Sequence, residues 1–271
     1  MTTIRFSQFF SVDSPKAIKA AKFNYLNAIN YMAPHKSGNV GNLCSHASPG
    51  CIALCLGWFS GQAGIVTKAT GTSAARQSRI RKAEYFMHDR KAYLREMFTH
   101  TARLIAKAKR LKLTLCERPN GSTDIAYEGQ KLIVDEAFAA HLSRLSGETI
   151  EPGTHNIFTA FPMVQFVDYT KNHLRFNRPL PANYHLTFSL SETNEQHALD
   201  LLSRGHNVAI VFGCERPATW HGYRVIDGDE HDLRHLDPRN VVVGLTPKGS
   251  KAKRDTSGFV VRGIATIPMA A

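Results

Sequence analysis

The stretch "NVAIVF", residues 207–212, decides the fold class. It is one asparagine followed by an unbroken apolar run, and "NVVVGL" at residues 240–245 repeats the pattern. Continuous runs of β-branched residues are typical of strands buried on both faces, as in a parallel sheet covered by helices. The two runs therefore predict an α/β protein with a mainly parallel sheet.

Shorter strand candidates alternate with helical segments along the rest of the chain. The strand candidates lie at residues 23–33, 111–116, 164–167, 184–190 and 223–226. Residues 72–110 contain no glycine or proline and form the clearest helical region, with an expected break near His88 and Asp89. This alternation predicts one α/β domain over residues 23–271, a complete or partial (βα) TIM-type barrel, after a polar leader at residues 1–22.

The composition is that of a globular protein with a basic surplus. A hydrophobic fraction of 43% over 271 residues is enough to bury a sizeable core. No apolar run approaches the ~18 residues of a membrane span, and the N-terminus lacks the apolar stretch of a signal peptide. We therefore expect a cytoplasmic protein without a membrane partner. The 34 basic and 22 acidic residues give a formal net charge of +12, which favours DNA, RNA or another polyanion as partner.

Polar clusters follow five of the strand candidates, and the carboxyl ends of parallel strands meet at one rim. We therefore expect one site at that rim. The candidate acids, bases and nucleophiles are Asp124, Asp168, Lys171, Glu192, Asp227 and Asp229. The candidate substrate-binding residues are Arg118, Asn120, Ser122, Asn194, Lys248, Asp255 and Ser257.

The sharpest signal is the cysteine loop, "LCSHASPGCIALCLG" at residues 43–57. It places Cys44, Cys51 and Cys55 in a turn punctuated by proline and glycine, where packing alone explains three cysteines poorly. In a reducing cytoplasm clustered thiols are more often metal ligands than disulfides, and the total of five cysteines is odd. Three thiolates leave one iron of a [4Fe–4S] cluster open, whereas a structural zinc site wants four ligands. We expect a metal centre here, an iron–sulfur cluster more than zinc.

The helical region 72–110 follows the cysteine loop and is rich in basic residues, so its first turns should stand near the rim. The lysines after the last strand candidate would close the other side of the site. Such side chains hold the phosphate backbone of a nucleic acid. The candidate nucleic-acid-binding residues are Arg76, Arg79, Lys82, Lys251 and Lys253.

Several stretches together resemble a family of bacteriophage proteins labelled gene product 88-like. The resemblance covers about residues 24–260, in the same order, and rests on "NLCSHASPGCIALCL", "ARQSRIRKAEYFMHDRKAYLREM", "RPNGSTDI", "VQFVDYTKN", "YHLTFSLSETN" and "VIDGDEHDLRHLDPRNVVVGLTPKG". One departure is Pro119, where an aliphatic residue would precede Asn-Gly. The resemblance implies a phage protein that acts inside the infected bacterial host.

Two more distant resemblances bear on the chemistry. "SPGCIALCL" resembles the cysteine loop of phage proteins related to radical S-adenosylmethionine enzymes, whose partial barrel carries its cluster after the first strand. This chain departs from their C-x3-C-x2-C spacing and shows no clear methionine-binding glycine motif. The cysteines and aspartates also resemble those of phage transglycosylases that insert deazaguanines into DNA, although here the cysteines come earlier in the chain. Both resemblances imply DNA modification, and the first implies S-adenosylmethionine as a cofactor.

The residues support two functions. In the first, the metal centre and the rim acids modify a nucleotide or a nucleic-acid base. In the second, a structural zinc only stabilises the cysteine loop, and the protein is not an enzyme but binds phage DNA or RNA. Both need a nucleic-acid or nucleotide partner, and only the first makes a product.

Overall fold

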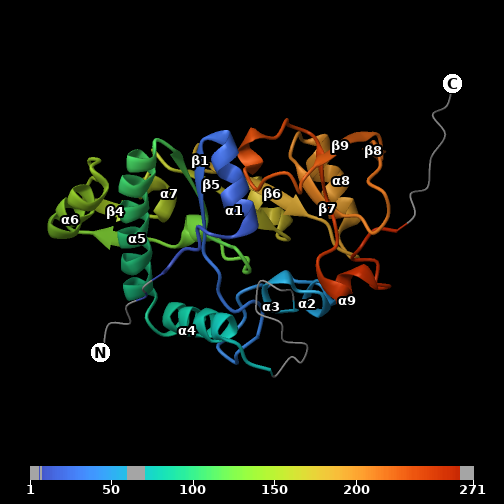
Figure 1. Ribbon diagram of the computed structural model, residues 1–271, viewed down its shortest axis with the longest axis horizontal. Coiled ribbons are helices and arrows are strands. Elements are labelled where there is room, and N and C mark those ends of the chain that lie inside the picture. The colour runs from blue at the N-terminus through green and yellow to red at the C-terminus, as the bar shows by residue number, and fades with distance from the viewer. Residues whose placement is uncertain (1–5, 7, 60–70, 263–271) are drawn as a thin grey trace.

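The computed structural model describes residues 6, 8–59 and 71–262, and an eight-stranded sheet organises them (Figure 1). The strand order is β1-β2-β5-β6-β7-β10-β9-β8. The bounds are β1 Tyr25–Ile29, β2 Thr114–Arg118, β5 Gln165–Thr170, β6 Tyr184–Ser189, β7 Val208–Val211, β8 Thr219–Trp220, β9 Tyr223–Asp227 and β10 Val242–Leu245. A separate antiparallel pair joins β3 (Leu132–Val134) to β4 (Gly153–His155).

The large sheet is parallel throughout, except that β8 pairs antiparallel with β9 at one edge. β7 and β10 pair in register from Val208 with Val242 to Val211 with Leu245. Val208, Ile210 and Val242 are completely buried, because neighbours cover these strands on both faces. The predicted α/β fold with a mainly parallel sheet is confirmed, as one mixed α/β domain.

The sheet is open, so of the expected complete or partial TIM-type barrel the complete form is wrong, and the described strands do not show a barrel. β1 and β8 stand at its two ends, and no pairing within the described part of the chain joins them. The last strands explain why the sheet does not close. In the sheet β9 lies outside β10, and the two-residue β8 forms the edge beyond β9 and pairs with it antiparallel. That edge does not offer β1 a parallel partner.

Helices cover the sheet and carry the cysteine loop. The α-helices are α1 Pro15–Ala20, α2 Pro49–Ala53, α3 Leu56–Phe59, α4 Ala74–His88, α5 Arg90–Leu111, α6 Glu136–Ser146, α7 Ile157–Ala160, α8 Glu195–Ser203 and α9 Gly249–Lys253. The 3-10 turns are η1 Ala21–Phe23, η3 Tyr127–Gly129, η4 His173–Asn177 and η5 Arg234–Leu236. No described helix has both the length and the hydropathy needed to cross a bilayer.

The predicted helical region divides where it was expected to. Asp89 separates α4 from α5, and its side chain accepts a 3.0 Å hydrogen bond from the backbone N–H of Ala92. Such a cap starts α5 in a new direction. In Figure 1, α5 runs beside α6, whereas α4 lies across its lower end and α2, α3 and α9 lie together below the sheet.

The described part of the leader belongs to the core. Phe9 and Phe10 are buried, and the Phe9 ring lies 5.1 Å from that of Tyr93 in α5. Ser11 exchanges two backbone hydrogen bonds of 2.8 Å with Ile29 at the edge of β1. These contacts tie the chain before residue 23 to the first strand and to α5.

We expect Phe9→Ala to lower the free energy of unfolding by about 3–5 kcal/mol, the usual cost of deleting a buried phenylalanine ring. Phe9 is 1% exposed, whereas Ile18 in the same segment is 63% exposed, so Ile18→Ala is a matched control. Urea unfolding of both variants measures the difference. Equal stability of the two variants would show that the leader does not contribute to the core.

Candidate functional site

A cavity of about 710 Å³ lies where the carboxyl ends of β2, β5 and β6 face the cysteine loop. Asp124 reaches it from the loop after β2, Lys171 from the residue after β5, and Ser189 from the end of β6. All three cysteines of the cysteine loop line it as well. The structure thus brings the thiols and part of the rim together in one space.

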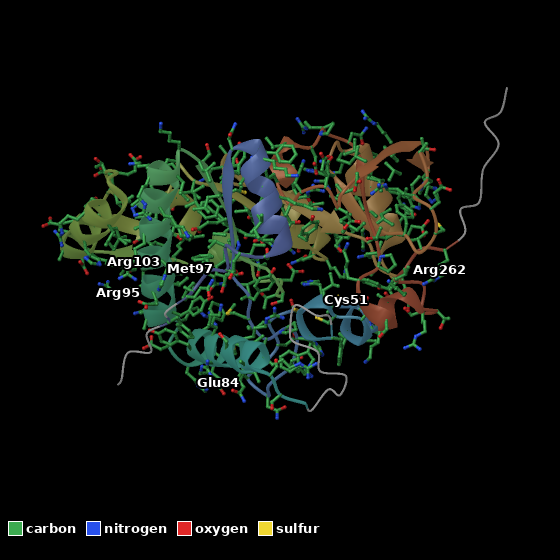
Figure 2. All side chains as sticks on the ribbon, in the orientation of Figure 1. Cys51, Glu84, Arg95, Met97, Arg103 and Arg262 are labelled. Carbon is green, nitrogen blue, oxygen red and sulfur yellow. The ribbon has the colours of Figure 1, made fainter. Side chains whose placement is uncertain are left out.

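The cysteine loop is built from two short helices. Ser48 caps α2, because its Oγ accepts a 3.2 Å hydrogen bond from the N–H of Cys51, and Pro49 occupies the first helical position. Cys55 lies between α2 and α3, and Cys44 lies before the cap. The three thiols are free and half-buried, and Figure 2 shows Cys51 within the group formed by α2, α3 and α9.

Backbone N–H groups are directed at two of the three sulfurs. The N–H of His35 near Cys44, and those of Gly57 and Trp58 near Cys55, lower the pKa of these thiols. Cys44 Sγ itself donates to the carbonyl of Ser122 at 3.7 Å. Burial raises the pKa of all three thiols, that of Cys55 to about 12, even though Lys171 lies near Cys51 and Arg79 near Cys55, so the thiols are neutral at pH 7. Hydrogen bonds to sulfur oppose this rise because they favour the thiolate, as they do around metal-bound cysteines.

Arg76 and Arg79 of α4 brace the cysteine loop. Arg79 Nη1 donates to the carbonyl of Gly57, and Arg76 Nε donates to that of Trp58 at 3.1 Å. The Arg76 guanidinium also lies 4.6 Å from the centre of the Trp58 ring. The braced residues are those whose N–H groups face Cys55, so these arginines fix the surroundings of its sulfur.

This bracing corrects the expectation that α4 presents a phosphate-binding surface. Arg76, Arg79 and Lys82 are only 1%, 5% and 5% exposed, and Lys82 Nζ donates to the carbonyl of Phe9 at 2.9 Å. Positions three residues apart share one face of a helix, and this face turns inward. The remaining candidates for nucleic-acid contact, on α9, are exposed.

Asp124 and Lys171 are the candidate catalytic residues that line the cavity. Asp124 accepts hydrogen bonds from the backbone N–H of Lys171 at 2.9 Å and from Arg175 Nη1 at 3.2 Å. Lys171 Nζ donates to Ser189 Oγ at 2.7 Å and to the carbonyl of Leu190 at 3.2 Å. These bonds lock the ends of β2, β5 and β6 to one another.

Asp168 does not line the cavity and is completely buried. Its carboxylate accepts hydrogen bonds from Asn120 N at 2.8 Å, Asn120 Nδ2 at 2.9 Å and Tyr184 OH at 3.0 Å. Burial raises the pKa of Asp168 to about 6, although Arg118, Arg175 and the bonds from Asn120 oppose the rise. Asp168 therefore joins three strands below the rim, which corrects its expected role as a group in contact with substrate.

Most of the chain, including the cysteine loop and the rim, matches a known protein family. A family model described as Gene product 88 matches residues 9–263. The chain belongs to this family. The resemblance to gene product 88-like phage proteins is thereby confirmed. No curated protein and no solved structure matches the chain significantly, so the more distant resemblances gain no support.

The other candidates of this gene product 88 family member lie outside the cavity lining. They are Arg118, Asn120, Glu192, Asn194, Asp227, Asp229, Lys248, Asp255 and Ser257. Several of them pair with one another or with neighbours: Asp227 with Arg216 at 2.7 Å and Asp229 with Lys248 at 2.8 Å. The Arg216 hydrogen bond holds the pKa of Asp227 below its usual range. Of the substrate-binding candidates, Ser122 lines the cavity, and its Oγ donates to the carbonyl of Met32 at 2.6 Å.

Sequence reasoning missed Arg175, which holds the rim from below. It is 7% exposed and donates to both carboxylate oxygens of Glu128, at 2.8 and 2.7 Å, and to Tyr184 OH at 2.8 Å. Arg175 lies 47 positions from Glu128, and nothing in "HLRFN" distinguishes a buried arginine from an exposed one. Only the folded arrangement reveals this contact.

We expect Asp168 to make stability depend on pH. Its carboxyl binds a proton more tightly in the folded chain, where the pKa is about 6, than at its ordinary value of 3.8. The resulting stabilisation is present below about pH 4 and is lost as the pH rises through about 6. At roughly 1.4 kcal/mol per pKa unit it amounts to about 3 kcal/mol.

Asp168→Asn removes this titration, so wild type should lose about 3 kcal/mol relative to the variant between about pH 4 and about pH 8. Urea unfolding across that range measures the difference, with exposed Asp200→Asn as control. If the difference in free energy of unfolding between wild type and Asp168→Asn stays constant with pH, Asp168 does not have a raised pKa in the folded chain.

Proposed function

We propose that this protein is a metal- or iron–sulfur-dependent enzyme that modifies a nucleotide or a nucleic-acid base in the cytoplasm of the infected bacterial host. The observation that carries the proposal is the meeting of three half-buried cysteines with Asp124 and Lys171 in one cavity. In parallel α/β sheets, ligands bind at the carboxyl ends of the strands, which is where this cavity lies.

The donor set suits a thiophilic metal centre. Thiolates select zinc or iron–sulfur clusters, and the N–H groups directed at Cys44 and Cys55 favour the thiolate form. Within the described ranges no three His, Cys, Asp or Glu side chains already stand in a metal-binding arrangement. Binding would therefore draw the three sulfurs together.

The two metal centres lead to different chemistry. When bound, a [4Fe–4S] cluster supplies electron transfer, with S-adenosylmethionine as the cofactor that the more distant resemblance implies, whereas zinc supplies a Lewis acid. The chain itself contributes charge and position. The Lys171 ammonium is close enough to Cys51 to oppose the rise that burial causes in the pKa of this thiol, and it would also attract an anionic substrate.

The cavity suits a base or a nucleotide. Ligand pockets of roughly 300–1,000 Å³ hold molecules of that size, and this cavity measures about 710 Å³. Trp58, Phe59 and Tyr169 line it, and bases stack on aromatic faces. A cation lies over each ring, namely Arg76, Lys251 and Arg118 in that order, so a base would stack on the other face or displace the cation. Lys251 Nζ lies 3.8 Å from the centre of the Phe59 ring, so the exposed lysines of α9 stand beside the lining, where they could contact the phosphates of a longer strand.

We expect Cys44→Ser, Cys51→Ser and Cys55→Ser each to lower the metal content of protein purified without oxygen. Cys214→Ser is the matched control, because this exposed cysteine lies outside the cavity. Absorbance with iron, sulfide and zinc analysis measures the outcome. Brown protein with iron and sulfide supports the cluster, and colourless protein with stoichiometric zinc supports the other centre. Wild-type protein with neither would refute the metal centre.

We expect the double replacement of Lys251 and Lys253 by Gln to weaken the salt dependence of nucleic-acid binding. For each phosphate that the protein no longer neutralises, the slope of log K against log salt becomes shallower by roughly 0.7–0.9. Replacing exposed Lys91 and Lys131 by Gln is the control with the same charge change, on the α5 and β3 side of the molecule. If both double variants behave alike, α9 does not contact a polymer, and a free nucleotide becomes the substrate.

A further inference from the structure

The loop between β6 and α8 reaches across to the cysteine loop through one carboxylate, that of Glu192. Glu192 Oε2 accepts a 2.8 Å hydrogen bond from Ser48 Oγ, and Oε1 accepts a 2.6 Å hydrogen bond from the backbone N–H of Gly50. Glu192 is partly buried and does not line the cavity. Both of its oxygens are engaged by the cysteine loop, so the side chain holds that loop and is not itself directed at a substrate.

The hydrogen bonds continue to one of the cysteines. Ser48 Oγ donates to Glu192 and also accepts from the N–H of Cys51 at 3.2 Å. The carboxylate therefore fixes the rotamer in which Ser48 caps α2, and that cap fixes the backbone from which the Cys51 thiol projects. Bonds to an ionised carboxylate are about twice as strong as bonds between neutral groups.

Gly50 shows how closely the two loops fit. A Cβ atom at this position would lie 2.8 Å from Glu192 Oε2, from Phe259 Cβ and from Ser257 Oγ. The chain after α9 thus supports the same spot from the other side, because Asp255 accepts hydrogen bonds from the N–H groups of Ser257 and Val260 and so fixes this turn. The start of α2 is enclosed by the carboxylate on one side and this turn on the other.

The geometry points to Glu192 as a positioning residue, which holds Ser48 and Gly50 so that Cys51 is presented to the metal centre. The role in metal binding rests on the proposed function, whereas the contacts of Glu192 with Ser48 and Gly50, here called the clamp, are hydrogen bonds within the chain itself. This assignment replaces the expectation of Glu192 as a catalytic acid or base. It also gives the β6–α8 loop a direct effect on the thiols without any contact with substrate.

The clamp is tested first in metal-free protein by the rate at which iodoacetamide alkylates Cys51, read by peptide mass spectrometry. Exposed Cys214 in the same sample is the internal standard. Removal of two hydrogen bonds to a charged group should favour local opening, so Glu192→Ala should raise the relative rate roughly tenfold or more. Glu195→Ala is the matched control, since Glu195 is exposed in the first turn of α8 and pairs with His221.

Two further variants separate positioning from a general loss of structure. Glu192→Gln keeps the length of the side chain, an acceptor for Gly50 and a partner for Ser48, so it should restore most of the protection. Ser48→Ala combined with Glu192→Ala should add little to Glu192→Ala alone, because both act through one contact. If Glu192→Ala unfolds the chain by circular dichroism, Glu192→Gln and Ser48→Ala carry the test. Rates equal to those of Glu195→Ala in all folded variants would overturn the clamp.

Cobalt(II) alone then reports on the metal centre. Titrated without oxygen into metal-free wild type, it should give thiolate-to-cobalt absorption, and Glu192→Ala should weaken cobalt binding about 10–100-fold, as removal of a partner that orients a ligand usually does. Glu192→Gln should shift the cobalt spectrum less than Glu192→Ala. If alkylation responds to Glu192 but wild type binds neither cobalt nor reconstituted iron and sulfide, the metal-dependent function is overturned and the clamp stands.

Discussion

The carboxylate of Asp168 is the constraint on which the rim depends. It projects from β5, accepts hydrogen bonds from Asn120 after β2 and from Tyr184 in β6, and so ties three adjacent strands together. Removing a carboxylate from water costs several kcal/mol unless donors replace the lost hydration, and these donors do so only in part, because the pKa of Asp168 is still raised to about 6. Asn120 also donates to the carbonyl of Ile125, so the same network shapes the loop that delivers Asp124 to the cavity.

The cysteine loop is held by side chains of both charges. Arg76 and Arg79 donate to its carbonyls from α4, and Glu192 accepts from its hydroxyl and N–H groups from the β6–α8 loop. Helices as short as α2 and α3 are not stable without tertiary partners. Side chains that look like a binding surface when charges are counted along the sequence are therefore used to hold a loop in place.

The sequence predicts the strands and helices of the fold well, but it predicts poorly which charged side chains are buried and which residues they contact. Unbroken runs such as residues 207–212 indicate buried parallel strands, and the break at Asp89 follows from capping, because both are local effects. Closure of the sheet is not local: it depends on where β9 inserts relative to β10. Burial of Arg76 and the pairing of Arg175 with Glu128 are equally invisible, since both partners must first be brought together by the fold.

Packing accounts for the burial of a neutral cysteine, which behaves as a small hydrophobe. It does not account for the N–H groups of His35 and Gly57, which favour the thiolate forms of Cys44 and Cys55, whereas the N–H of Trp58 already donates to the carbonyl of Cys55 at 3.1 Å. A neutral thiol is a weak acceptor, and a buried donor without a good acceptor costs about 1–3 kcal/mol. The same contacts become strong, charge-assisted bonds when the sulfur is a thiolate. A buried thiolate in turn needs a cation beside it, and the chain itself supplies two, Lys171 near Cys51 and Arg79 near Cys55.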